Sequence, residues 1–243
     1  MTTLIGIKTN VGEESIILAS DTQLNYYSVK GEPIEKRPLL KIVYGEYWAL
    51  AQSGADTNDL RSFFNKLRNP KDRRYKDFGT DKLEKMINVA VDNKRFMEIC
   101  ELNAKYVREE EDVDQTHEFI MAVNKPKMEL YHVDIFGNLK TQSDRGFVVL
   151  GSTSDKAESY LDDEIDKDTY HESNIDISRA VQLLNNALKN SNTELLSGLP
   201  MDLVIIRKNE IRGYGKRIKD AVEFAERKVI EEIVNEIENP HKV

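Results

Sequence analysis

The second residue of the chain is a threonine, and this position could carry chemistry. The chain begins MTTLIGIKTN, so removal of Met1 would leave Thr2 with a hydroxyl and a free α-amine on one residue. An α-amine has an unperturbed pKa of roughly 7.7–8.0, so near neutral pH it can accept the proton of the hydroxyl. Nucleophile and general base would then come from the same residue. Small residues are common at position 2, so the hypothesis depends on supporting groups elsewhere in the chain.

A nucleophile of this kind needs three supporting groups. A cation favours the neutral form of the amine, a carboxylate holds that cation, and a backbone N–H receives the oxyanion. The chain offers candidates in order: Asp21 ends the segment ESIILASD, Lys41 begins the apolar segment KIVY, and Gly54 ends the segment AQSG. Lys36 is a competing candidate for the cation.

The spacing of apolar residues predicts runs of strands separated by helices. Two hairpins come first, followed by two amphipathic helices, three strands, two more helices, two strands and a long C-terminal helix. The expected strands are 3–8, 15–21, 39–44, 47–53, 118–124, 128–134, 146–150, 201–207 and 210–215. The expected helices are 60–67, 83–91, 155–161, 177–189 and about 219–238.

This order of elements predicts an α+β fold with antiparallel sheets, because strands come in runs and do not alternate with helices. Segments such as LIGI and VVL are apolar on both faces, so we expect two sheets packed together with helices outside them. No low-complexity linker divides residues 1–243, which are expected to form a single domain. The charged segments 68–80, 103–117 and 162–176 are expected to be solvated loops.

Five segments of the chain, taken together, indicate a family. They are TTLIGI with ILASDTQ, LLKIVYGEYWALAQSGADTNDL, EFIMAVNKPKMELYHVDIFGNL, FVVLGSTSDKAESYL and TELLSGLPMDLVIIRKNEI. In this order they resemble the motifs of proteasome β-type subunits, within the N-terminal nucleophile hydrolase superfamily. The resemblance extends from residue 2 to about residue 215. Each motif is modest alone, and the shared order is what makes the likeness specific.

The resemblance implies a four-layer αββα sandwich and a role for each matching position. Thr2 would be the nucleophile and its amine the base, while Lys41 would tune that amine and Asp21 would orient the lysine. The Gly54 N–H would form the oxyanion hole. Glu194 stands where the family has aspartate. The side chains expected to surround the threonine are Ser152, Glu194 and Ser197.

The lysine assignment depends on the length of one turn. Counting back from Gly54 without a gap reaches Leu39 at the position of the family's lysine. Lys41 fits only if about two residues have been lost at the Gly45-Glu46 turn, so Lys36 stays open as the alternative.

The resemblance implies a threonine-type peptidase or amidohydrolase that acts through an acyl-enzyme. The expected substrate is a peptide or an unfolded protein, the expected assembly is a homo-oligomeric ring or similar oligomer, and an ATPase or regulatory partner is implied. Removal of Met1 alone would expose Thr2. Transpeptidation stays open, because an amine could resolve the same acyl-enzyme. The alternative from another class is a catalytically inactive, proteasome-like structural subunit.

The composition argues against several other functions. With 35 Lys and Arg against 43 Asp and Glu, the net charge is −8, which suits neither nucleic acid nor an anionic membrane surface. No apolar run approaches the roughly 18 residues of a membrane-spanning helix, and no signal-peptide core is present, so a cytoplasmic location is expected. A single cysteine, Cys100, and histidines without metal-ligand spacing predict no metal and no cofactor. These histidines are His117, His132, His171 and His241.

Overall fold

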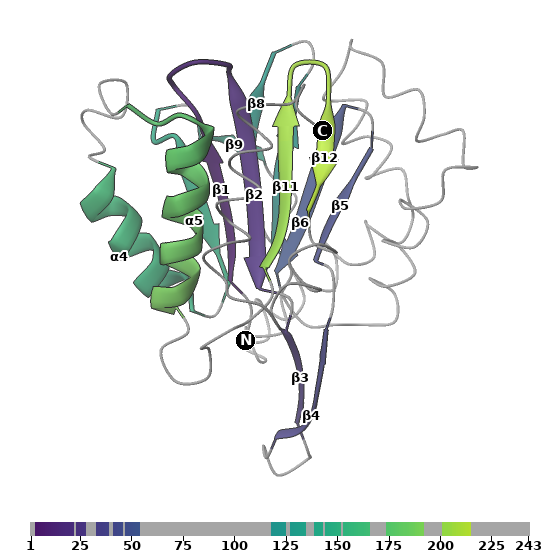
Figure 1. The fold of residues 1–243 in the computed structure, drawn as a ribbon. Coiled ribbons are helices and arrows are strands. Elements are labelled where there is room, and N and C mark those ends of the chain that lie inside the picture. The colour runs from purple at the N-terminus through teal and green to yellow at the C-terminus, as the bar shows by residue number, and fades with distance from the viewer. Residues whose placement is uncertain are drawn as a thin grey trace, which may run out of the picture.

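A computed structural model gives the fold of the chain over twelve segments (Figure 1). The described residues are 3–21, 23–27, 33–38, 41–45, 47–53, 118–124, 127–134, 139–142, 144–151, 153–165, 174–191 and 201–214. Within 23–27 and 33–38 only the backbone is described. The expected helices at 60–67, 83–91 and 219–238 lie outside these segments, and so do the charged segments 68–80 and 103–117.

Five strands form a first antiparallel sheet, called sheet 1 here, in the order β10-β1-β2-β11-β12. The strands of sheet 1 are β1 (Leu4–Lys8), β2 (Ser15–Asp21), β10 (Phe147–Leu150), β11 (Met201–Arg207) and β12 (Ile211–Gly213). Strands β1 and β2 are joined by a tight turn in which Gly12 has a φ of 77°, a conformation that glycine adopts without strain. All five strands were expected from the sequence, within two residues at each end.

A second antiparallel sheet, called sheet 2 here, has the order β5-β6-β7-β8-β9. The strands of sheet 2 are β5 (Ile42–Tyr44), β6 (Trp48–Ser53), β7 (Glu118–Val123), β8 (Glu129–Val133) and β9 (Leu139–Thr141). The short edge strand β9 was not predicted, because LKT is too short and too polar to give an alternating pattern.

A separate hairpin of strands β3 (Gln23–Tyr27) and β4 (Pro33–Pro38) extends away from the two sheets (Figure 1). The sequence did not predict these strands. The segments QLNYY and PIEKRP lack an apolar stripe, and proline at both ends of β4 argues against an interior strand. Among the described residues these two strands pair only with each other, and a two-stranded sheet tolerates such residues.

The two sheets pack face to face through apolar side chains. Strands β1, β2 and β11 contribute Leu4, Leu18 and Val204 to this layer, and sheet 2 contributes residues such as Ile120 and Leu130. The sheets approach closely at Gly6, where a Cβ atom would lie 2.9 Å from Leu130 Cδ1 and 3.2 Å from Ile120 Cγ2. A glycine at this position of β1 therefore leaves room for the facing side chains.

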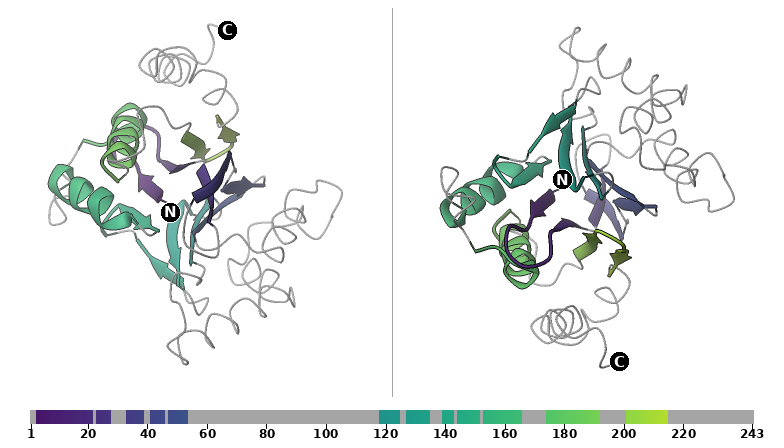
Figure 2. Two further views of the ribbon diagram at one scale, coloured as in Figure 1. Left: turned by 90° about the horizontal axis from the view of Figure 1, so that it is seen from below. Right: turned by 90° about the horizontal axis from the view of Figure 1, so that it is seen from above.

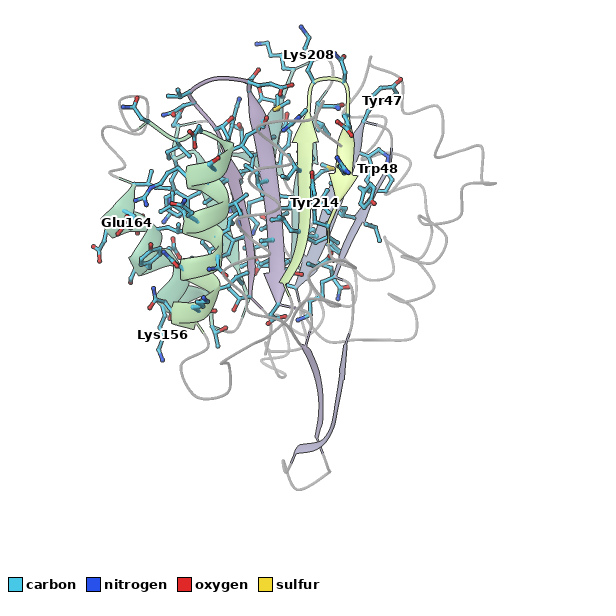
Figure 3. The ribbon with its side chains drawn as sticks, in the orientation of Figure 1. Tyr47, Trp48, Lys156, Glu164, Lys208 and Tyr214 are labelled. Carbon is cyan, nitrogen blue, oxygen red and sulfur yellow. The ribbon has the colours of Figure 1, made fainter. Side chains whose placement is uncertain are left out.

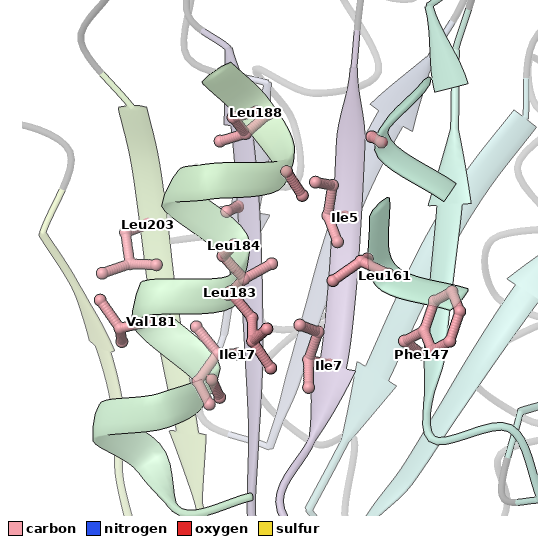
Figure 4. Packing of buried hydrophobic residues seen from close by; sticks show 14 of the residues in the cluster. Ile5, Ile7, Ile17, Phe147, Leu161, Val181, Leu183, Leu184, Leu188 and Leu203 are labelled. Carbon is pink, nitrogen blue, oxygen red and sulfur yellow. The ribbon is translucent and has the colours of Figure 1, made fainter. Parts of the chain in front are cut away.

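Two helices cover the opposite face of sheet 1, as Figures 1 and 2 show from three directions. Helix α4 spans Ser154–Glu164 and helix α5 spans Ile177–Ser191. Figure 4 shows Val181, Leu184 and Leu188 of α5 against side chains of β1, β2 and β11. The exposed residues Lys156 and Glu164 lie on the outer side of α4 (Figure 3). Sheet 1 is thus covered on both faces, as its doubly apolar strands predict.

The expected solvated loop at 162–176 is wrong at both ends. Helix α4 continues to Glu164, and both Ile165 and Ile175 are buried in the core between the helices and sheet 1, at 0% and 3% exposure. The charges between them dominate the local composition and hide these two apolar anchors. Residues 166–173 lie outside the described segments.

The described residues establish an α+β fold with two antiparallel sheets, as the order of elements predicted. Among the described helices, none is long and apolar enough to cross a membrane.

Candidate functional site

The start of β1 and the end of β2 lie side by side at one end of sheet 1. Leu4 faces Ser20 in the register of these strands, so Thr3 comes next to Asp21. The Asp21 N–H donates to the Thr3 carbonyl oxygen at 3.2 Å, and the Thr3 N–H donates to Asp21 Oδ2 at 3.1 Å. This carboxylate oxygen is therefore held one peptide bond away from Thr2, which itself lies outside the described residues.

A lysine from the other sheet contacts the second oxygen of the same carboxylate. Lys41 Nζ donates a hydrogen bond to Asp21 Oδ1 and forms an ion pair with it. Both side chains are 4% exposed. Lys41 directly precedes β5 of sheet 2, and Asp21 ends β2 of sheet 1, so the ion pair joins the two sheets.

Burial acts on both charges of this pair. Desolvation raises the pKa of Asp21 above its ordinary value of 3.8, while the Lys41 charge and its hydrogen bond oppose the rise. Desolvation lowers the pKa of Lys41 below 10.5, while the charge and hydrogen bond of Asp21 oppose the fall. Each residue thus favours the charged form of the other, in a place where neither would readily keep its charge alone.

The backbone around Lys41 is held by a further carboxylate. Asp202, on β11 of sheet 1, accepts a hydrogen bond from the Ile42 N–H at 3.2 Å and is 5% exposed. The Gln52 N–H donates to the Lys41 carbonyl oxygen at 3.1 Å. The approach of the lysine to Asp21 is therefore fixed from both sheets.

Hydroxyl groups from three distant segments also meet beside β1. Thr3 Oγ1 lies 2.5 Å from Thr153 Oγ1 and donates to Ser191 Oγ at 3.1 Å. Ser191 Oγ donates in turn to the Leu188 carbonyl oxygen at 2.8 Å. Thr3 and Ser191 are buried, at 0% and 3% exposure. The site thus includes the turn that follows β10 and the end of α5.

The structure brings together two of the predicted site residues, Asp21 and Lys41. Lys36, the competing lysine, lies on β4 and its side chain is not described. Five predicted residues lie outside the described segments: Thr2, Gly54, Ser152, Glu194 and Ser197. Their described neighbours include Ser53, which ends β6 and is 7% exposed, and Thr153, which touches Thr3.

Four residues of this cluster were missed at the sequence level: Thr3, Thr153, Ser191 and Asp202. Thr3, Thr153 and Asp202 are adjacent to predicted residues or lie within the matched motifs, but nothing in a single sequence marks a hydroxyl as a bridge. Asp202 gave the clearest available signal, because a carboxylate inside the apolar strand MDLVIIR needs a hydrogen-bond donor when buried.

The described part of the chain holds no group of three or more metal-ligating side chains. The cluster instead combines a buried charge pair, a second carboxylate and three hydroxyls next to the start of β1. Such an arrangement can polarise and orient a residue attached to Thr3.

Comparison with known proteins returned no match, either to models of protein families or to curated protein sequences.

We expect Asp21→Asn to lower the free energy of unfolding by about 3–5 kcal/mol, because it removes the charge that faces Lys41 in a buried site. Asp21→Asn combined with Lys41→Met should recover at least half of this loss, since the buried ammonium is then gone as well. Urea denaturation at pH 7 measures both values. Asp155→Asn, at an exposed position of α4, is the matched control and should change stability little. Equal losses in the single and double variants would contradict this account.

The Asp21→Asn variant should also become more stable as the pH rises. Without Asp21, the influences that raise the pKa of Lys41 are lost, and burial lowers it further below the ordinary 10.5. Between the folded and unfolded pKa values the unfolded chain binds more protons, so stability rises with pH, by at most about 1.4 kcal/mol per pH unit for one proton. Unfolding measured from pH 7 to 10 should show this extra slope relative to Asp21→Asn/Lys41→Met. Parallel curves for the two variants would contradict it.

Proposed function

We propose that this protein is a threonine-type peptidase or amidohydrolase whose nucleophile is Thr2, exposed by removal of Met1. One observation carries the proposal: the buried Asp21–Lys41 pair is bound, through Asp21 Oδ2, to the N–H of the residue that follows Thr2. A cation and its carboxylate are the support that an N-terminal threonine needs for catalysis.

The proposed reaction begins when Thr2 Oγ1 attacks the carbonyl carbon of a substrate amide. The hydroxyl proton moves to the α-amine of Thr2, and the oxyanion is stabilised by the backbone N–H of Gly54. The C–N bond then breaks as the proton passes to the leaving amine, which leaves an ester on Thr2. A water molecule attacks this ester, giving one proton to the α-amine. The amine returns that proton to Thr2 Oγ1 as the acid product departs.

Lys41 would act in this reaction through its charge. A cation near the α-amine disfavours the ammonium form and so increases the fraction of amine that can accept a proton. The effect is strong where water is excluded, and both partners of the ion pair are almost completely buried. Asp21 would keep the lysine protonated and correctly placed.

The rest of the proposal follows from the resemblance of the motifs. The fold would be completed as a four-layer αββα sandwich by helices at 60–67 and 83–91, outside sheet 2. The substrate would be a peptide or an unfolded protein, and the assembly a homo-oligomeric ring or similar oligomer. A cytoplasmic location and an ATPase or regulatory partner belong to the same proposal.

The charge pair also favours activity over the alternative of an inactive structural subunit. Removing two charges from water is costly, and apolar residues of similar size often stabilise a fold as well as or better than a buried ion pair. A subunit with only a structural role would gain little from this pair. Hydrolysis and transpeptidation share the same acyl-enzyme, and they differ only in whether water or an amine attacks it.

We expect a peptide epoxyketone to form a cyclic adduct on Thr2, because this reaction needs a hydroxyl and a free α-amine on one residue. Mass spectrometry of the N-terminal peptide, after purification from the native host, should show loss of Met1 and the adduct. Thr2→Ser should keep the adduct and Thr2→Ala should lose it. A native protein that retains Met1 throughout would rule out this mechanism.

The choice between the two lysines can be tested with the same probe. Lys41→Met should slow adduct formation by at least about 100-fold, while Lys36→Met should leave it nearly unchanged. Circular dichroism and thermal melting establish that each variant is folded. An unchanged rate in Lys41→Met, or an equal loss in Lys36→Met, would show that the lysine is misassigned.

A further inference from the structure

The side chain of Thr3 joins elements that lie far apart in the sequence. We propose that Thr3 is a positioning residue that fixes the nucleophile Thr2, by tying the start of β1 to the beginning of helix α4 and the end of helix α5. This inference rests on the proposed function, and it gives a role to Thr3, a residue of the TTLIGI motif to which the resemblance assigned none.

The hydroxyl hydrogen bonds around Thr3 have a defined direction. Ser191 Oγ has one proton, which it donates to the Leu188 carbonyl oxygen, so it accepts from Thr3. Thr3 Oγ1 has then used its own proton, so the 2.5 Å contact with Thr153 requires Thr153 to donate. The chain of donors therefore runs from Thr153 through Thr3 and Ser191 to the backbone of α5. Because Thr3 both accepts and donates, its side chain is restrained on two sides.

The hydroxyl of Thr153 is directed to Thr3 and not to the first turn of α4. Thr153 occupies the N-cap position of α4, where a threonine oxygen normally accepts from the first free N–H groups of the helix. Here its side chain makes no capping hydrogen bond. Its hydroxyl instead contacts Thr3. A helix that leaves this stabilising contact unmade is consistent with a requirement at Thr3.

The backbone of Thr3 is held as firmly as its side chain. Its N–H and carbonyl oxygen both bond to Asp21, and no part of the residue is exposed. Four hydrogen bonds from three elements therefore fix the residue to which Thr2 is attached. Rotation of Thr3 would displace the nucleophile relative to Asp21 and Lys41, and a shift of about 1 Å can cost about 100-fold in rate.

The test measures the rate constant for adduct formation at saturating epoxyketone, together with the probe concentration that gives half the maximal rate. Thr3→Val keeps the shape of the side chain and removes the hydroxyl. We expect it to lower the rate constant by about 100-fold with little change in the half-maximal concentration. Thr3→Ser keeps the hydroxyl and should react within a fewfold of wild type.

Thr9→Val is the matched control. Thr9 lies just beyond the other end of β1, is 2% exposed, and its Oγ1 accepts from the Ser15 N–H at 2.8 Å. Loss of the Thr9 hydroxyl should destabilise β1 without slowing adduct formation. A wild-type rate constant in Thr3→Val, or an equal loss in Thr9→Val, would overturn the proposal. Should Thr3→Val not fold, Ser191→Ala removes the acceptor and leaves Thr3 in place, and an unchanged rate there would overturn it equally.

Amide hydrogen exchange separates failure of this inference from failure of the proposed function. The N–H of residue 3 donates to Asp21, so its exchange, followed by NMR, reports the restraint without any catalysis. It should exchange at least about tenfold faster in Thr3→Val than in wild type. Unchanged exchange overturns the role of Thr3 alone. Absence of any adduct on wild-type Thr2 overturns the proposed function, whatever the exchange shows.

Discussion

A buried ion pair between two sheets is the constraint on which this site depends. Asp21 and Lys41 come from different sheets, and each is only 4% exposed. A buried charge without its partner is costly, so the end of β2 and the start of β5 cannot separate without a large loss of free energy. Asp21 also binds both the N–H and the carbonyl oxygen of Thr3, so the same ion pair fixes where β1 begins.

The apolar layers around the Asp21–Lys41 pair exclude water and so strengthen the attraction between its charges. Sheet 1 is covered on one face by sheet 2 and on the other by helices α4 and α5, so its strands exclude water along most of their length. Polar groups gather where the strands end, with Asp21 closing β2 and the Thr3–Thr153–Ser191 hydroxyls beside β1. The fold thus places a low-dielectric core directly behind a polar cluster, and charges there act on one another with little screening.

Local pattern was sufficient to predict most strands and both described helices. The continuous apolar runs of β1 and β2 follow from burial on both faces, and the apolar period of α5 follows from burial of one face. Prediction from local pattern failed where the composition of a segment did not reflect its structure. The hairpin of β3 and β4 has no apolar stripe, and the charged segment at 162–176 conceals the buried anchors Ile165 and Ile175. At 162–176 the two buried residues are too few to produce a period.

The sequence by itself determined the residue types available for chemistry: a threonine at position 2, an aspartate that ends a strand, and lysines in the next hairpin. Only the tertiary structure decided that Lys41 meets Asp21 and that Asp202 holds the backbone beside Lys41. It also decided that Thr3 meets Thr153 and Ser191, which lie 150 and 188 positions further along the chain. Such contacts depend on strand register and on how the layers stack. A slip of one residue turns every side chain to the opposite face, and no local pattern records which distant segment will lie there.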